Sequence, residues 1–168
     1  VIGVVIAFYS SSLYRILELA LPTDADDNYV NMIAGIMFLS LGVGEIVGGY
    51  LAGILCDKFP VRNVGAIALS SYLLAVIMSL VGINYTDTLA PVMIAAFIWG
   101  FIEAYIENWV TVVCSRKYKG EFEGFVIIQH FPCVTFCIYE VMLLIWDPSM
   151  DFILPMLFVL SIPCVISL

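Results

Sequence analysis

Charged residues are scarce in this sequence of 168 residues: only 12% are charged, whereas 63% are hydrophobic. A soluble domain has about 25% charged residues, because water has to cover its surface. The scarcity excludes an ordinary water-soluble globular protein, and the mean hydropathy of +1.09 agrees with that. We therefore expect a lipid bilayer to surround most of the chain, and the net charge of −8 does not suit nucleic acid as a partner.

Clusters of metal ligands and nucleophiles are also missing. The sequence has five cysteines but no CxxC pair, and apolar packing is the simpler interpretation of Cys133 and Cys137, which share a helix face. No serine, cysteine or histidine arrangement suggests a nucleophile, and no group of histidine, aspartate and glutamate has the spacing of metal ligands. We expect no enzymatic activity and no cofactor or metal.

A signal peptide is absent from the first residues, which have neither a basic start nor a small-residue cleavage site. The sequence begins with Val1 rather than methionine, and residues 166–168 are still apolar. We expect both ends to continue into a longer protein.

Long apolar stretches predict transmembrane helices, since a helix needs about 20 apolar residues to cross a hydrocarbon core of about 30 Å. The chain offers six such stretches, at residues 2–21, 31–55, 64–82, 90–114, 125–145 and 152–168. The expected fold is an all-α transmembrane bundle of six helices that forms a single domain.

The basic residues predict the orientation of this bundle. Five of the six lie in the loops after the second and fourth spans, namely Lys58, Arg62, Arg116, Lys117 and Lys119. The loops after the first, third and fifth spans carry only acidic charges. Cytoplasmic loops are enriched in lysine and arginine, so the even-numbered spans end inside and both chain ends are expected to be cytoplasmic.

Ionisable residues within the spans are the first candidates for function, because a charge at the bilayer centre costs at least about 2.5–3.5 kcal/mol. Their side chains should face other helices or a water-filled cavity rather than lipid. The set comprises Arg15, Glu18, Glu45, Glu103, Glu107, His130 and Glu140.

Glu103 and Glu107 are four residues apart and therefore share one face of the fourth span, with Asn108 nearby. Two neighbouring carboxylates in a low dielectric repel each other, so one of them can bind a proton reversibly or pair with a cation. Alternatively, each glutamate forms a hydrogen bond to a neighbouring helix and only positions it. Glu45 in the second span is a further candidate for binding substrate or protons.

The two other candidates each have a structural alternative. Arg15 could pair with a substrate carboxylate or an interior glutamate, or could reach the membrane interface beside Glu18. His130 could relay protons, although a hydrogen-bonded structural histidine is the simpler interpretation.

Glycine is concentrated in the second span. The pairs Gly44/Gly48 and Gly49/Gly53 have the spacing that lets helix backbones approach closely. We expect close packing there, in a helix that can slide or rock against its neighbour.

The loop after this span carries the most specific motif. Residues 53–62 read Gly-Ile-Leu-Cys-Asp-Lys-Phe-Pro-Val-Arg, which resembles the signature loop between the second and third helices of each half of a major facilitator superfamily transporter. The matching residues include Gly53, Asp57, Lys58 and Arg62. Pro60 stands where the family pattern has a glycine, and Val61 stands where it has a basic residue. Residues 100–129 also show a likeness to the UNC-93-like branch of that superfamily.

The resemblance implies one six-helix half of a transporter. The chain is then either a fragment that carries one half, most simply the second half, in which a weakened motif is usual, or a protein that works as a paired half. Two such halves rock around a site near the midplane. In the family the signature loop helps to hold the cytoplasmic side closed, a role that would fall here to Gly53, Asp57, Lys58 and Arg62. The first, second, fourth and fifth helices of a half commonly line the cavity, and Arg15, Glu45, Glu103 and His130 lie on those spans.

Two functions follow as hypotheses. The first is secondary active transport of a small solute, coupled to protons through Glu103, with a second six-helix half as partner. The acidic interior favours a cationic or proton-coupled solute. The alternative is a membrane subunit that resembles a facilitator but has lost transport, and that binds or scaffolds other membrane proteins.

Overall fold

The computed structural model describes residues 2–22, 25–84, 88–117, 133–134, 136–139, 141–142 and 145. Four α-helices make up most of this part: α1 (Ile2–Ala20), α2 (Asp27–Lys58), α3 (Val61–Asn84) and α4 (Ala90–Lys117). Every regular element among the described residues is helical, so the expected all-α class is confirmed there. The predicted fifth span falls mostly, and the sixth entirely, outside the described residues, as do His130 and Glu140.

Three of these helices, α2, α3 and α4 up to Arg116, are long and apolar enough to cross a membrane. With 32 residues, α2 is about 48 Å long, which exceeds the hydrocarbon thickness of about 30 Å. It therefore extends beyond the predicted span 31–55 at both ends. Asp27 in its first turn and Lys58 in its last turn have the charges that the helix dipole favours at those positions.

A tight turn joins α2 to α3. Phe59 ends α2 in an extended conformation, with φ −122° and ψ 156°, because the ring of a following proline disfavours helical geometry at the residue before it. The Phe59 amide still donates to the carbonyl of Leu55, at 2.9 Å. The carbonyl of Pro60 then accepts hydrogen bonds from the amides of Asn63 and Val64 and so opens α3.

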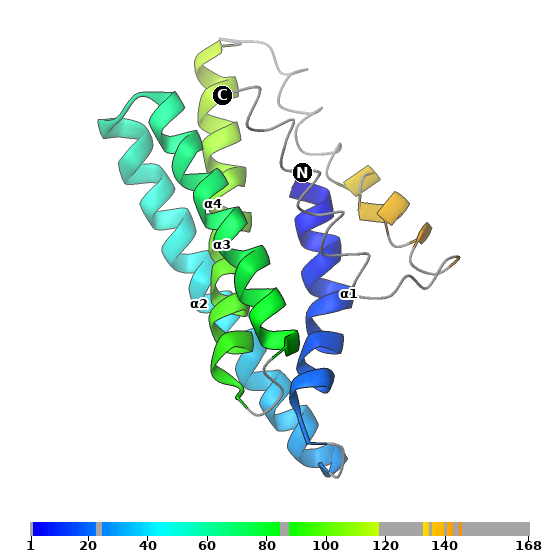
Figure 1. The fold of residues 1–168 in the computed structure, drawn as a ribbon. Helices are drawn as coiled ribbons and strands as arrows, with labels where there is room; N and C mark the ends of the chain where they lie inside the picture. Colours follow the sequence, from blue (N-terminus) through cyan, green and yellow to red (C-terminus); the bar gives the residue numbers. More distant parts are fainter. Residues whose placement is uncertain are drawn as a thin grey trace.

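The four helices alternate in direction, and α4 contacts all of the other three (Figure 1). Its most extensive contact is with α2, which runs parallel to it, and the next is with the antiparallel α3. α1 approaches α4 near one end of the bundle and diverges from it towards the other (Figure 1).

Trp99 of α4 is the centre of the core, where α1, α3 and α4 meet. Its ring lies 4.8 Å from that of Phe8 and 5.6 Å from that of Tyr72, measured between centroids. Its indole nitrogen donates to the buried hydroxyl of Ser79 at 3.0 Å. The polar edge of a large buried ring is thus satisfied inside the apolar bundle, as burial requires.

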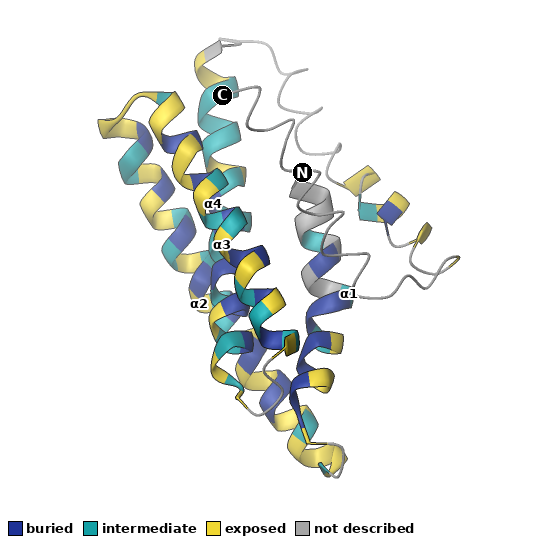
Figure 2. Cartoon of the chain, viewed as in Figure 1, coloured by how far each residue is buried: buried dark blue, intermediate teal, exposed yellow. Residues whose placement is uncertain are grey.

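Many positions on the outward surface of α2 are exposed (Figure 2), and several of them carry large apolar side chains. Leu39, Ile46 and Tyr50 are 68%, 74% and 70% exposed. In water such a surface would form an apolar patch of a size rare in soluble monomers. The surface suits contact with lipid or with another membrane helix.

Candidate functional site

The contact between α2 and α4 is made by backbone on backbone. A Cβ atom added to Gly44 would overlap the carbonyl oxygen of Phe97, and one added to Gly48 would overlap that of Phe101. The predicted close approach at Gly44 and Gly48 is therefore confirmed. Gly100 of α4 makes a third contact of this kind, against the carbonyl of Leu41.

The second glycine pair behaves differently. A Cβ on Gly49 would lie 3.3 Å from the Asn108 side-chain nitrogen, whereas one on Gly53 would have nothing within 4 Å. The prediction of a close backbone contact at Gly53 is wrong, because Gly53 lies on an exposed side of α2, whereas Ala52 and Cys56 lie in a buried cluster with Tyr105 of α4.

The acidic candidates lie on α2 and α4 beside this interface. Glu45 is half-buried and precedes Gly49 by one helical turn. Gly49 in turn faces Asn108 and Ala104 of α4. The edge of α2 that carries Glu45 therefore adjoins the edge of α4 that carries Asn108.

Glu103 and Glu107 differ in their exposure although they share a face of α4. Glu103 is half-buried and its Oε2 atom is shielded from solvent, whereas Glu107 is exposed. Asn108, also exposed, donates from its side chain to the carbonyl of Ala104 at 2.8 Å. Glu103 is thus the carboxylate of this pair that the helices enclose.

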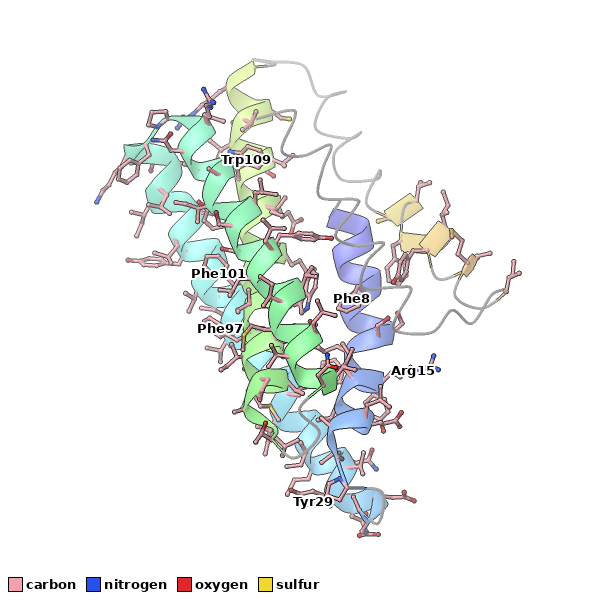
Figure 3. The ribbon with its side chains drawn as sticks, in the orientation of Figure 1. Phe8, Arg15, Tyr29, Phe97, Phe101 and Trp109 are labelled. Atoms are coloured by element: carbon pink, nitrogen blue, oxygen red, sulfur yellow. The ribbon has the colours of Figure 1, made fainter. Side chains whose placement is uncertain are left out.

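Arg15 lies on the exposed side of α1, and its side chain points away from α3 and α4 (Figure 3). Glu18, three residues later, is exposed as well. This placement favours the interfacial interpretation of Arg15 over pairing with an interior glutamate of α4.

The end of α2 is attached to α4 through Arg116. The Arg116 guanidinium donates to the carbonyl of Cys56 at 2.9 Å, and its Nη2 lies 3.8 Å from the Asp57 carboxylate. The last carbonyls of a helix lack intrahelical donors, and a cation there is favoured by the helix dipole. Arg116 therefore supplies both a donor and a positive charge where α2 ends.

Two aromatic side chains of α4 hold the first turn of α3 in a similar way. The hydroxyl of Tyr105 donates to the carbonyl of Val64 at 3.1 Å, and the indole of Trp109 donates to that of Val61 at 3.2 Å. Tyr105, Trp109 and Arg116 share one face of α4, because four and eleven residues correspond closely to whole helical turns. We call these three residues the α4 stripe.

An apolar cluster lies beneath these hydrogen bonds. It contains Ala52 and Cys56 of α2, Val64 and Ala68 of α3, and the fully buried ring of Tyr105. The α4 stripe and this cluster together fix the α2–α3 turn to α4.

Of the residues matched to the signature loop, Gly53, Asp57, Lys58 and Arg62 are all exposed, and Asp57 is the one that Arg116 reaches. The sequence motif did not identify Arg116, Tyr105 or Trp109 as partners of the loop. The predicted topology contained one usable signal, since it placed Arg116 at the same membrane face as Asp57.

Within the part of the chain that the structure describes, no three histidine, cysteine, aspartate or glutamate side chains are grouped closely enough to hold a metal ion. Comparison of the chain with protein-family models, with curated proteins and with solved structures finds no match. The likeness to the major facilitator superfamily therefore depends on the signature loop and on the expected topology.

Proposed function

We propose that this chain is a multi-pass membrane protein with six spans and cytoplasmic ends, and that it forms one half of a secondary transporter of the major facilitator type. It would move a small solute by alternating access together with a second six-helix half. The signature loop, the basic residues near it and three helices of membrane-spanning length support this proposal.

The contact between Arg116 and the end of α2 is the observation that carries it. The loop that resembles the family signature is also the loop that α4 holds through Arg116. Arg116 would orient this loop, and the contacts that open during each cycle would be those between the loop and the second half. The Asp57 side chain is 83% exposed and is therefore available for such a contact.

The backbone contact between α2 and α4 limits where motion can occur. At Gly44, Gly48 and Gly100 the two backbones lie against each other with no side chain between them, so α2 and α4 should move as one body. The rocking motion would therefore take place between this body and the second half, rather than between α2 and α4.

The face that carries Glu45, Glu103 and Glu107 is the proposed site for a cationic or proton-coupled solute. Glu103, half-buried with one shielded oxygen, is the carboxylate proposed to exchange protons. Exposed Glu107 and Asn108 would lie nearer the cytoplasmic entrance of the same face.

Transport can be tested with the full-length protein in liposomes loaded with a pH-sensitive dye. A panel of small organic cations, beginning with tetraethylammonium, is added under an imposed pH gradient. We expect solute-dependent proton flux that Glu103→Gln abolishes and that Glu18→Gln, which neutralises an exposed carboxylate of α1, leaves intact. Equal flux in wild type and Glu103→Gln would remove Glu103 as the coupling site.

The second candidate function, a non-transporting subunit that binds other membrane proteins, is favoured by the apolar outer face of α2. A cysteine at Ile46, which is 74% exposed, should then crosslink to a partner protein in native membranes. Crosslinking to a partner combined with no solute-dependent flux would favour this candidate over transport.

A further inference from the structure

The turn between α2 and α3 concentrates positive charge in an acidic chain. Lys58 and Arg62 are exposed within five residues of each other, and the guanidinium of Arg116 lies at the end of α2, on the carbonyl of Cys56. The Asp57 carboxylate is the acidic group at this turn, and Arg116 lies 3.8 Å from it. The net charge of the turn is therefore positive, although that of the whole chain is −8.

An exposed aromatic ring lies within this basic surface. Phe59 is 48% exposed, although it directly follows Lys58 and lies only three residues before Arg62. The turn is exposed at the end of the bundle (Figure 2). In water this exposure would be unfavourable, whereas at a membrane surface a ring between two cations can enter the headgroup layer.

The turn is held in a fixed shape. The ring of Pro60 restricts Phe59, the Phe59 amide is bonded to Leu55, and Trp109 and Arg116 hold the backbone on either side. A surface that is already ordered loses little conformational entropy when a ligand binds.

We propose that the α2–α3 turn binds the headgroups of anionic phospholipids, with Lys58 and Arg62 contacting the phosphates and Phe59 inserted at the level of the upper acyl chains. The inference depends on the membrane location proposed above but not on transport. It predicts a preference for phosphatidylglycerol over phosphatidylcholine that weakens with salt.

Lipid retention by the full-length protein tests this inference. The protein is placed in nanodiscs containing equal amounts of phosphatidylglycerol and phosphatidylcholine and is then released into detergent, and the retained lipids are counted by native mass spectrometry. We expect an excess of phosphatidylglycerol that falls about fivefold in each of Lys58→Gln and Arg62→Gln. Phe59→Ser should also lower retention. Asn63→Ala, which changes an exposed and uncharged side chain of the same turn, should leave retention unchanged.

Three results would overturn the proposal. The first is equal retention of both lipids, and the second is an unchanged excess in the Lys58→Gln, Arg62→Gln double variant. The third is displacement of phosphatidylglycerol by soluble glycerol 3-phosphate at matched concentration, which would indicate a site for a free phosphate ester. Solute-dependent proton flux is measured separately, so loss of lipid preference and loss of transport can be distinguished.

Discussion

The effect of a glycine on helix packing in this protein depends on the atoms that face it. Gly44, Gly48 and Gly100 each face a backbone carbonyl of the neighbouring helix, so no side chain can replace their hydrogen atom without moving a helix. Gly53 belongs to the same sequence pattern yet faces open space. Spacing alone cannot separate these cases, because it does not determine which side of α2 faces α4.

Gly48→Leu should destabilise the protein by about 2–3 kcal/mol, because the new side chain would overlap the Phe101 backbone and separate α2 from α4. Equilibrium unfolding in mixed detergent micelles would measure the loss. Gly53→Leu is the matched control and should cost nothing measurable, since a Cβ there meets no atom within 4 Å. Equal losses in the two variants would contradict the assigned contact.

The pair formed by Arg116 and Asp57 should contribute little to stability. A double-mutant cycle with Arg116→Gln and Asp57→Asn should give a coupling energy below about 1 kcal/mol, because both side chains are substantially exposed. Arg116→Gln alone should cost more than Asp57→Asn, since it also removes the donor to the Cys56 carbonyl. The opposite order in unfolding measurements would show that the ion pair, rather than the carbonyl bond, holds the end of α2.

At the scale of the helices, α4 holds the molecule together. Its side near α2 is packed through glycine, whereas the α4 stripe reaches the carbonyls of Cys56, Val61 and Val64. Tyr105 and Trp109 of the stripe each combine an apolar ring with a polar hydrogen-bond donor. One side chain can therefore pack between helices and also donate to a backbone carbonyl of α3. The α2–α3 turn should therefore follow α4 in any motion.

Tyr105→Phe and Trp109→Phe test this attachment. Each removes one hydrogen bond of about 1 kcal/mol while keeping an aromatic ring. We expect amide hydrogen exchange in residues 57–64 to become about fivefold faster, a change that mass spectrometry can measure. Tyr50→Phe, on the exposed face of α2, should leave the exchange unchanged. Unchanged exchange in both core variants would mean that the apolar cluster alone holds the turn.

The approximate positions of the four described helices could be predicted because apolar length and proline placement are local properties of the sequence. Phe59–Pro60 is an example, since the proline directly limits the conformation of the preceding residue. The outward direction of Arg15 could not be predicted, because it depends on how α1 is rotated against α4. The contact between Asp57 and Arg116 could not be predicted from the motif either, because the two residues are 59 positions apart in the sequence.

At the scale of the whole molecule, charge is separated along the bundle. The basic turn between α2 and α3 and the basic end of α4 lie at one end, while Asp26 and Asp27 begin α2 at the other. The positive-inside rule predicts that this basic end faces the cytoplasm. The proposed gate and the proposed lipid surface would then share the cytoplasmic end.

Sided labelling in a cysteine-free background tests this orientation. A cysteine at Lys58 should react with a membrane-impermeant maleimide from the cytoplasmic side, and one at Asp27 from the outside. Both positions are exposed, so reactivity depends on the side of addition rather than on burial. Labelling of both from the same side would contradict the orientation.

Alternating access is the central claim, and accessibility at Asn108 tests it most directly. Asn108 lies on α4 beside α2, on the proposed solute face. In the full-length, otherwise cysteine-free protein, we predict that a cysteine at Asn108 is alkylated from either side of the membrane. Asp57→Asn, which weakens the proposed cytoplasmic gate, should increase the rate from the cytoplasmic side and decrease it from the outside. Alkylation from one side only, at a rate that Asp57→Asn does not change, would contradict the account.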